Sequence, residues 1–168
     1  MSLKRNGAVT LVVVLGAAIG SAPAEAAATR AEYIAQVDPI CQNATPPLVK
    51  ANKAYAKNFN RLIARLRARR FKGIIKVIHR TATALNRFTN IYGSVTDQVA
   101  AVPPAPPDAP IIEGWLQHRR DAEGFARSAA RAMSQIKFRR FDQQIAKAAQ
   151  ADTQASGSIS GFGFQYCA

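Results

Sequence analysis

The sequence predicts an all-α protein: an up-and-down helical bundle of two helical hairpins plus a short N-terminal helix, with a terminal disulfide. Three observations support this. Apolar residues recur at alternating steps of four and three over residues 74–102, which keeps one face of a helix apolar. Five prolines divide the chain at residues 103–110. Two cysteines, Cys41 and Cys167, lie near opposite ends of the chain that follows an N-terminal leader.

Residues 1–26 have the features of a secretory signal peptide. Two basic residues precede a short apolar run at residues 8–19, and A-x-A cleavage motifs end at Ala24 and Ala26. The apolar run is too short for an ordinary membrane-spanning helix, although an N-terminal membrane anchor is the alternative. We expect an exported protein, extracellular or in the cell envelope, with a single mature domain over residues 27–168 and no transmembrane span in it.

The mature chain is expected to begin with a short helix. Thr29 and Glu32 are three residues apart, as in a capping box that satisfies two orphan amides at a helix start. This helix would carry Cys41 inward. Pro39 is expected to kink or restart it, and the proline pair at residues 46–47 to end it.

The second and third helices are predicted to form an antiparallel hairpin. The inward stripe of the second runs from Leu48 to Leu66, and the third covers residues 74–102, with a weak point at Gly93-Ser94. A strand is the competing interpretation of residues 74–78, but the helical period continues past them. One continuous helix would leave a long apolar face unburied, so a turn is expected with its tip at residues 69–72.

The proline-rich residues 103–110 predict a stiff connector, because proline at this density cannot continue a helix. Asp108 is a suitable N-cap for a fourth helix. The predicted inward stripe of that helix consists of Ile112, Trp115, Ala122, Ala126, Ala129, Met133 and Ile136.

A second turn at residues 135–137 is predicted to lead into a fifth helix with apolar residues from Phe138 to Ile159 inside. Glycines after residue 156 would stop this helix and let the tail fold back toward the first one. An even pair of cysteines in an oxidising compartment predicts a Cys41–Cys167 disulfide. Two thiols, or a metal pair without further ligands, are the alternatives.

Several short stretches resemble one protein family. They are Ala31-Glu32-Tyr33-Ile34 leading to Pro39-Ile40-Cys41, the proline-rich segment before Trp115, and the closing Gly161-Phe162-Gly163-Phe164-Gln165-Tyr166-Cys167. Together they are similar to a group of small secreted helical proteins of high-GC Gram-positive bacteria. The resemblance implies export, a helical bundle and a terminal disulfide, and it supplies no catalytic residues. Pro39 departs from the family pattern, which has a helix former there.

Basic residues are distributed unevenly. Between Asp38 and Asp97 there are twelve Lys or Arg residues and no acid, and the whole chain carries a formal charge of +13. If the hairpins run up and down, both of their tips meet at one end and form a basic pole. The residues predicted to bind anions there are Arg65, Arg67, Arg69, Arg70, Lys72, Arg131, Lys137, Arg139 and Arg140.

A basic pole attracts polyanions, so the leading hypothesis is a non-enzymatic protein that binds anionic lipid head groups or cell-wall polymers. A face that only keeps the protein soluble is the alternative. Nucleic acid is disfavoured as a partner, because the basic region has few aromatic residues for base stacking, no recognised reading motif and a preceding export signal.

The sequence offers no catalytic, metal or cofactor site. His79 and His118 are not spaced as metal ligands with other His, Cys or acidic residues. Asp152 falls near an inward stripe, which either a buried partner such as Arg119 or simple exposure would explain.

The alternative function is an extracellular binding module for a small apolar ligand held between the helices. Trp115, Phe125 and Tyr92 would line the pocket. Aromatic residues at helical spacing also occur as ordinary core, so the pattern alone does not separate the two readings.

Overall fold

The computed structural model describes residues 27 and 29–167 of the 168-residue chain; the predicted signal peptide lies outside them. The elements are α1 (Arg30–Arg67), α2 (Ile74–Ala100), the short 3-10 helix η1 (Pro106–Asp108), α3 (Ala109–Ser134) and α4 (Phe138–Ser158). The described residues contain helices and no strand, so the all-α prediction is confirmed, including the helical assignment of residues 74–78.

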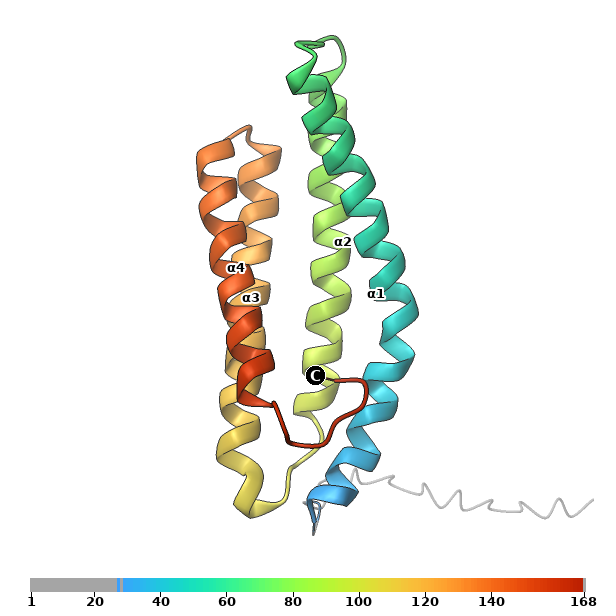
Figure 1. Cartoon of the computed structure of the whole chain (residues 1–168), viewed down its shortest axis with the longest axis vertical. Helices are drawn as coiled ribbons and strands as arrows, with labels where there is room; N and C mark the ends of the chain where they lie inside the picture. The colour runs from blue at the N-terminus through green and yellow to red at the C-terminus, as the bar shows by residue number, and fades with distance from the viewer. Residues whose placement is uncertain (1–26, 28, 168) are drawn as a thin grey trace, which may run out of the picture.

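The helices run up and down as two hairpins (Figure 1). α1 packs on α2, α2 on α3 and α3 on α4. The α1–α2 and α3–α4 turns lie at the same end of the molecule, and the α1–α2 hairpin extends further (Figure 1). The start of α1, the α2–α3 connector and the returning tail lie toward the other end.

The prediction of a separate short N-terminal helix was wrong. That segment and the predicted second helix form one continuous helix, α1. The capping box of Thr29 and Glu32 is confirmed at its start. Pro39, Pro46 and Pro47 all lie inside α1 without ending it. All three are exposed, as are the residues four positions earlier, so water can replace the amide donors that the prolines lack. The inward stripe continues across them, and its burial favours one helix.

The α1–α2 turn forms without glycine at the end of α1. Arg69 adopts φ 51°, its amide donates to the Leu66 carbonyl (3.0 Å), and the Arg70 amide donates to the Arg65 carbonyl (2.9 Å). This pair of bonds is the Schellman motif, which normally places glycine at the left-handed position. The predicted tip at residues 69–72 is therefore confirmed.

The α3–α4 turn repeats this geometry with an isoleucine. Ile136 adopts φ 60°, its amide donates to the Met133 carbonyl (3.0 Å), and the Lys137 amide donates to the Ala132 carbonyl (2.9 Å). The turn was predicted here, but the inward position of Ile136 was wrong. Its side chain is 46% exposed, because the left-handed residue rotates away from the helix face.

The core consists of two hydrophobic clusters stacked along the bundle. One lies toward the disulfide end and includes Tyr33, Val37, Val99, Ile112, Trp115 and Ile159. The other lies toward the turns and includes Leu62, Ile78, Leu85, Met133 and Phe141. The level between these clusters comprises residues 86–94 of α2 and 117–128 of α3, and we call it the waist of the bundle.

At the waist, α2 is continuous through Gly93-Ser94, so the prediction of a weak point in the helix there was wrong. Gly93 is buried, and a Cβ added there would overlap the carboxylate of Glu123 on α3. Glycine here thus leaves room for the end of the Glu123 side chain rather than providing a bend.

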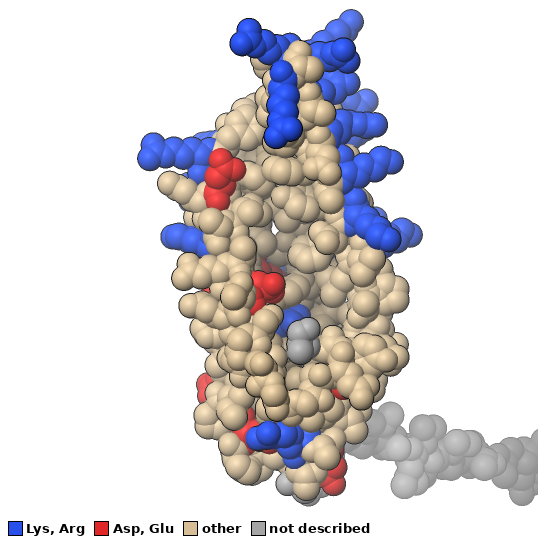
Figure 2. All heavy atoms as spheres, in the orientation of Figure 1, with Lys and Arg blue, Asp and Glu red and all other residues tan. Residues whose placement is uncertain are grey.

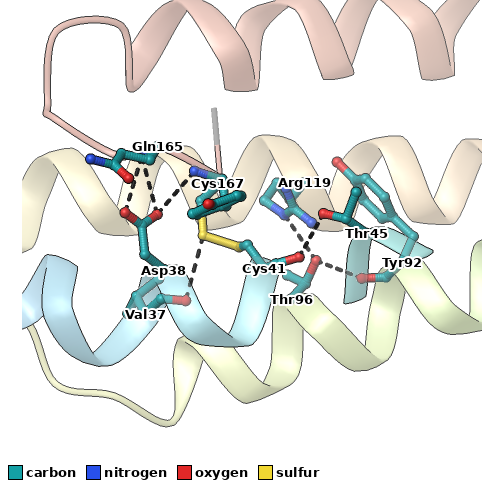
Figure 3. Close-up of a disulfide and its surroundings, with 10 residues drawn as sticks. Val37, Asp38, Cys41, Thr45, Tyr92, Thr96, Arg119, Gln165 and Cys167 are labelled. Carbon is teal, nitrogen blue, oxygen red and sulfur yellow. Dashed lines mark hydrogen bonds between the residues drawn. A yellow bond between two sulfur atoms is a disulfide. The ribbon is translucent and has the colours of Figure 1, made fainter. Parts of the chain in front are cut away.

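The disulfide prediction is confirmed: Cys41 and Cys167 are bonded, with their Cα atoms 5.3 Å apart. The Asp38 carboxylate on α1 accepts the backbone amides of Gln165 (3.0 Å) and Tyr166 (3.2 Å) in the tail (Figure 3). Gly163 is required in this tail, because its φ is 114° and an added Cβ would lie 3.2 Å from Ile34.

Asp108 precedes α3 as predicted, but its side chain makes no cap hydrogen bond. Instead the buried carboxylate pairs with the guanidinium of Arg30 at the start of α1. The Arg30 guanidinium holds the pKa of Asp108 below its usual range. This ion pair connects the two hairpins at the end opposite the turns.

Substitution of Tyr33 by phenylalanine is expected to stabilise the protein. Tyr33 is 0% exposed, and its hydroxyl has no hydrogen-bond partner among the described residues. Tyr33→Phe removes this buried polar group and should raise the free energy of unfolding by about 1 kcal/mol. A denaturant midpoint that falls instead would show that the hydroxyl is satisfied in solution.

Because Tyr33 is buried, we also expect the free energy of unfolding to fall at high pH. Burial raises its pKa from 10.0 to about 12 in the folded protein. Above pH 10 the unfolded chain releases this proton while the folded protein retains it, so stability falls until about pH 12. The unfolding free energy of Tyr33→Phe should decline less over this interval than that of the native protein.

Candidate functional site

The two turns bring the predicted anion-binding residues to one end of the bundle, which we call the basic pole. Arg65, Arg67, Arg69, Arg70 and Lys72 lie at the α1–α2 turn, and Arg131, Lys137, Arg139 and Arg140 at the α3–α4 turn. Figure 2 shows Lys and Arg side chains gathered at this end and along the α1 side. The pole has two levels, because the α1–α2 hairpin extends further (Figure 1).

Most of these cations are exposed, and Arg65 is the exception. It is half-buried, and its Nη1 donates to the Lys72 carbonyl at 2.7 Å. Arg65 therefore holds the α1–α2 turn together, which differs from its predicted place among the anion-binding side chains. The other eight are exposed to solvent.

No acidic side chain in the first turn offsets the positive dipole end of the two helices that start at the pole. Neither α2 nor α4 has a side-chain cap or an acid in its first turn. Lys76 in α2, and Arg139 and Arg140 in α4, lie near the positive ends of the helix dipoles, where a cation is unfavourable by about 0.3–1 kcal/mol. Asp142, one turn into α4, is the nearest acid in sequence to this turn. The unpaired amides and the cations together make a positive potential that an anion would relieve.

Large apolar side chains lie exposed among these cations. Phe71 is 62% exposed and follows Arg70 directly, while Ile75 is exposed at the start of α2. On the second tip, exposed Ile136 precedes Lys137. Each tip therefore presents apolar side chains beside basic ones.

A shallow depression of about 260 Å³ lies beside the second tip. Its lining includes Ser128, Gln135 and the two arginines Arg131 and Arg140. Two guanidinium groups with hydroxyl and amide donors suit a phosphate or carboxylate group. Two of the four cations of the α3–α4 turn thus line a concave surface.

A second hollow lies at the waist between the two hydrophobic clusters. This groove of about 280 Å³ is lined by all four helices, and its walls are mainly apolar. Figure 2 shows this face of the molecule hollowed at mid-height. Tyr55 and Phe88 contribute aromatic walls, and Glu123 and Asp152 contribute acids.

A pocket of about 200 Å³ adjoins the groove on the disulfide side, and Tyr92 and Asp152 line both. The Tyr92 hydroxyl donates to Asp152 Oδ1 at 3.0 Å. Burial raises the pKa of Tyr92 above the ordinary tyrosine value, so its hydroxyl also stays protonated in mildly alkaline solution. Arg119 also lines the pocket, with its guanidinium carbon 4.2 Å from the centre of the Tyr92 ring. Asp152 is exposed, as one of the two predictions had it, and it accepts from the tyrosine rather than pairing with Arg119 as a buried partner.

The three aromatic residues predicted to line a pocket separate in the structure. Tyr92 and Trp115 both line the pocket beside the disulfide. Phe125 instead lies beneath the ammonium group of Lys147 on α4, 5.7 Å from it. The structure therefore joins two of the three residues.

Other chemical groupings are sparse across the described residues. His79 is exposed and His118 is half-buried. No three His, Cys, Asp or Glu side chains of this part of the chain gather as a metal site. None of the described helices is both long and apolar enough to traverse a bilayer.

Comparison with protein-family models, with curated proteins and with solved structures finds no match for this chain.

The sequence did not identify two features of these sites. One is the exposed apolar residues at the tips, although Phe71 and Ile136 are apolar residues within predicted turns, which was the available signal. The other is the unpaired state of Arg119, although its place four residues after Trp115 and three before Ala122 puts it on the predicted inward stripe, which was the available signal.

Proposed function

We propose that this is an exported, non-enzymatic protein whose basic pole binds anionic lipid bilayers. Its support is the combination of eight exposed cations at two adjacent turns with apolar side chains among them. Cations attract anionic head groups, at about 1 kcal/mol for each Lys or Arg near the surface. The apolar side chains would enter the boundary between head groups and acyl chains.

Ile136 is the observation that carries this proposal. It is a β-branched residue in the left-handed conformation, which is strained by on the order of 1–3 kcal/mol, at a position where glycine is usual. Its side chain is exposed, so packing in the bundle gives little in return. An apolar side chain kept at such a position is explained by an apolar partner outside the bundle.

The apolar residues also favour a bilayer over a cell-wall polymer. A phosphate polymer would satisfy the arginines and lysines and leave Phe71, Ile75 and Ile136 in water. A bilayer offers both an anionic surface and hydrocarbon beneath it. Binding to the polymer alone is the competing outcome of the experiment.

Replacing Ile136 with glycine is expected to have opposite effects on folding and on binding. Ile136→Gly relieves the left-handed strain and should raise the free energy of unfolding by about 1 kcal/mol. The same change removes an apolar contact and should weaken binding to phosphatidylglycerol vesicles roughly tenfold. Vesicle sedimentation and denaturant unfolding measure the two effects.

The matched control is Ile111→Ser, because Ile111 is similarly exposed but lies at the start of α3, at the other end of the bundle. It should bind vesicles as the native protein does. If Ile136→Gly also binds like the native protein, or if phosphatidylcholine vesicles bind as well as anionic ones, the bilayer proposal is wrong.

A second candidate function is the binding of a small apolar ligand between the helices. The observation that favours it is the waist groove of about 280 Å³, whose walls come from all four helices and interrupt the core. Displacement of a solvatochromic apolar dye, measured by its fluorescence, tests this function independently of vesicle binding.

A further inference from the structure

Arg119 is a buried cation whose charge has no counterion in the described part of the chain. Arg119 is 9% exposed. Its Nε donates to the hydroxyl of Thr96 at 3.1 Å (Figure 3). Among residues 27 and 29–167, no carboxylate lies within 4.0 Å of the guanidinium, and its two terminal amino groups meet no acceptor. Its terminal nitrogens are not fully buried, since the Tyr33 hydroxyl is the one fully buried polar side-chain atom without a partner among the described residues. They therefore face the open space of the pocket that Arg119 lines.

Aromatic rings hold the guanidinium in place without neutralising it. Its central carbon is 4.2 Å from the Tyr92 ring centre and 5.3 Å from the Trp115 ring centre. These cation–π contacts offset part of the desolvation cost and fix the plane of the group. The four donors on the terminal nitrogens remain for another acceptor.

The space around Arg119 decides which acceptor would suit it. Arg119 lines the pocket of about 200 Å³ beside the disulfide, and the apolar groove of about 280 Å³ adjoins this pocket. A planar guanidinium binds a carboxylate through two parallel hydrogen bonds. Asp152 lines both spaces, so a ligand with a single negative charge meets less repulsion than a dianion such as a phosphate monoester.

We infer that the waist binds a small amphipathic monocarboxylate, with its carboxylate on Arg119 and its apolar body in the adjoining groove. This inference rests on the second candidate function, whose ligand class it specifies. Besides Arg119, the protein charges nearest to the ligand would be the acids Asp152, which is held by Tyr92 at the junction of the two spaces, and Glu123, which lines the groove.

The probe is decanoate, and Trp115 reports on it because it is the single tryptophan of the chain. A carboxylate that neutralises the cation 5.3 Å from the indole should change the tryptophan emission, saturably with concentration. Arg119→Gln removes the charge and should weaken decanoate binding at least about tenfold, because charge-assisted hydrogen bonds are lost. Its vesicle binding should not change, since Arg119 is remote from the basic pole.

Asp152→Asn is expected to strengthen decanoate binding, the opposite of Arg119→Gln. It therefore distinguishes an electrostatic role of Asp152 from a structural one. Asparagine keeps the oxygen that accepts from Tyr92 but removes the negative charge, so decanoate should bind several-fold more tightly. A structural role for Asp152 would instead predict weaker binding. Thermal unfolding followed by circular dichroism confirms that both variants are folded.

Two neutral or truncated probes separate the possible failures. If 1-decanol binds as tightly as decanoate, and Arg119→Gln binds both alike, the groove takes apolar ligands and the carboxylate inference is wrong. If neither probe changes the tryptophan emission or displaces the dye, both the inference and the second candidate function are wrong. Acetate should bind far more weakly than decanoate, and equal binding would contradict a role for the groove.

The end of the chain is one further possible occupant. A chain that ends at Ala168 carries its own carboxylate one residue after Cys167, which lines the same pocket as Arg119. Addition of three residues after Ala168 should leave decanoate binding unchanged. If binding appears only in the extended protein, the chain terminus is the partner of Arg119 and the ligand inference is wrong.

Discussion

Charge reversal at four tip arginines is expected to abolish binding to anionic vesicles. The variant R69E/R70E/R139E/R140E removes four cations, each contributing about 1 kcal/mol near the surface, and adds four repulsive charges. Affinity for phosphatidylglycerol vesicles should fall at least about a thousandfold, and the remaining binding should lose most of its dependence on salt. Vesicle sedimentation over a series of salt concentrations measures both quantities.

The control for this experiment reverses four cations elsewhere. K50E/K53E/K57E/R61E changes four exposed residues on the flank of α1 and alters the net charge by the same amount. If charge placement at the pole matters, the flank variant should keep most of its vesicle binding. Equal loss in the two variants would mean that vesicles respond to overall charge, and that the basic pole is only a soluble surface.

Removal of the disulfide is expected to have the largest effect on stability. The Cys41–Cys167 bond joins residues 126 positions apart. On the chain-entropy model, a loop of this length contributes about 4–5 kcal/mol by restricting the unfolded state. This is a large share of the roughly 5–15 kcal/mol that stabilises an ordinary domain. Denaturant unfolding of C41A/C167A should show a loss of this order.

Hydrogen exchange can locate where that loss acts. The tail amides of Gln165 and Tyr166 are protected by Asp38, so they should exchange much faster once the disulfide is absent. Asp38→Asn retains the disulfide and should lower stability by only about 1 kcal/mol. If C41A/C167A unfolds at the same denaturant concentration as the native protein, the tail is held mainly by its packing and hydrogen bonds.

Local rules predicted the parts of the fold that depend on nearby residues. The capping box at Thr29 and the stripe over residues 74–102 follow from spacings within a few turns. The proline-rich connector was predicted in the same way, but it ends at Asp108 rather than at residue 110, because Ala109 and Pro110 form the first turn of α3. The same rules were wrong at Pro39 and at Pro46-Pro47. There the apolar face on both sides of the prolines favours one continuous helix, and the exposed side of that helix can tolerate missing donors.

The features of the candidate sites were likewise predictable where they depend on nearby residues, and not where they depend on tertiary packing. The sequence by itself determined the helical class, the two turns, the paired cysteines and the number of cations near each turn, because each depends on composition or short-range spacing. Only the tertiary structure decided that Ile136 projects outward, that Arg65 stays within its turn, and that Arg119 faces a pocket. These depend on left-handed turn residues and on the register of helices against one another, which contacts distant in sequence determine.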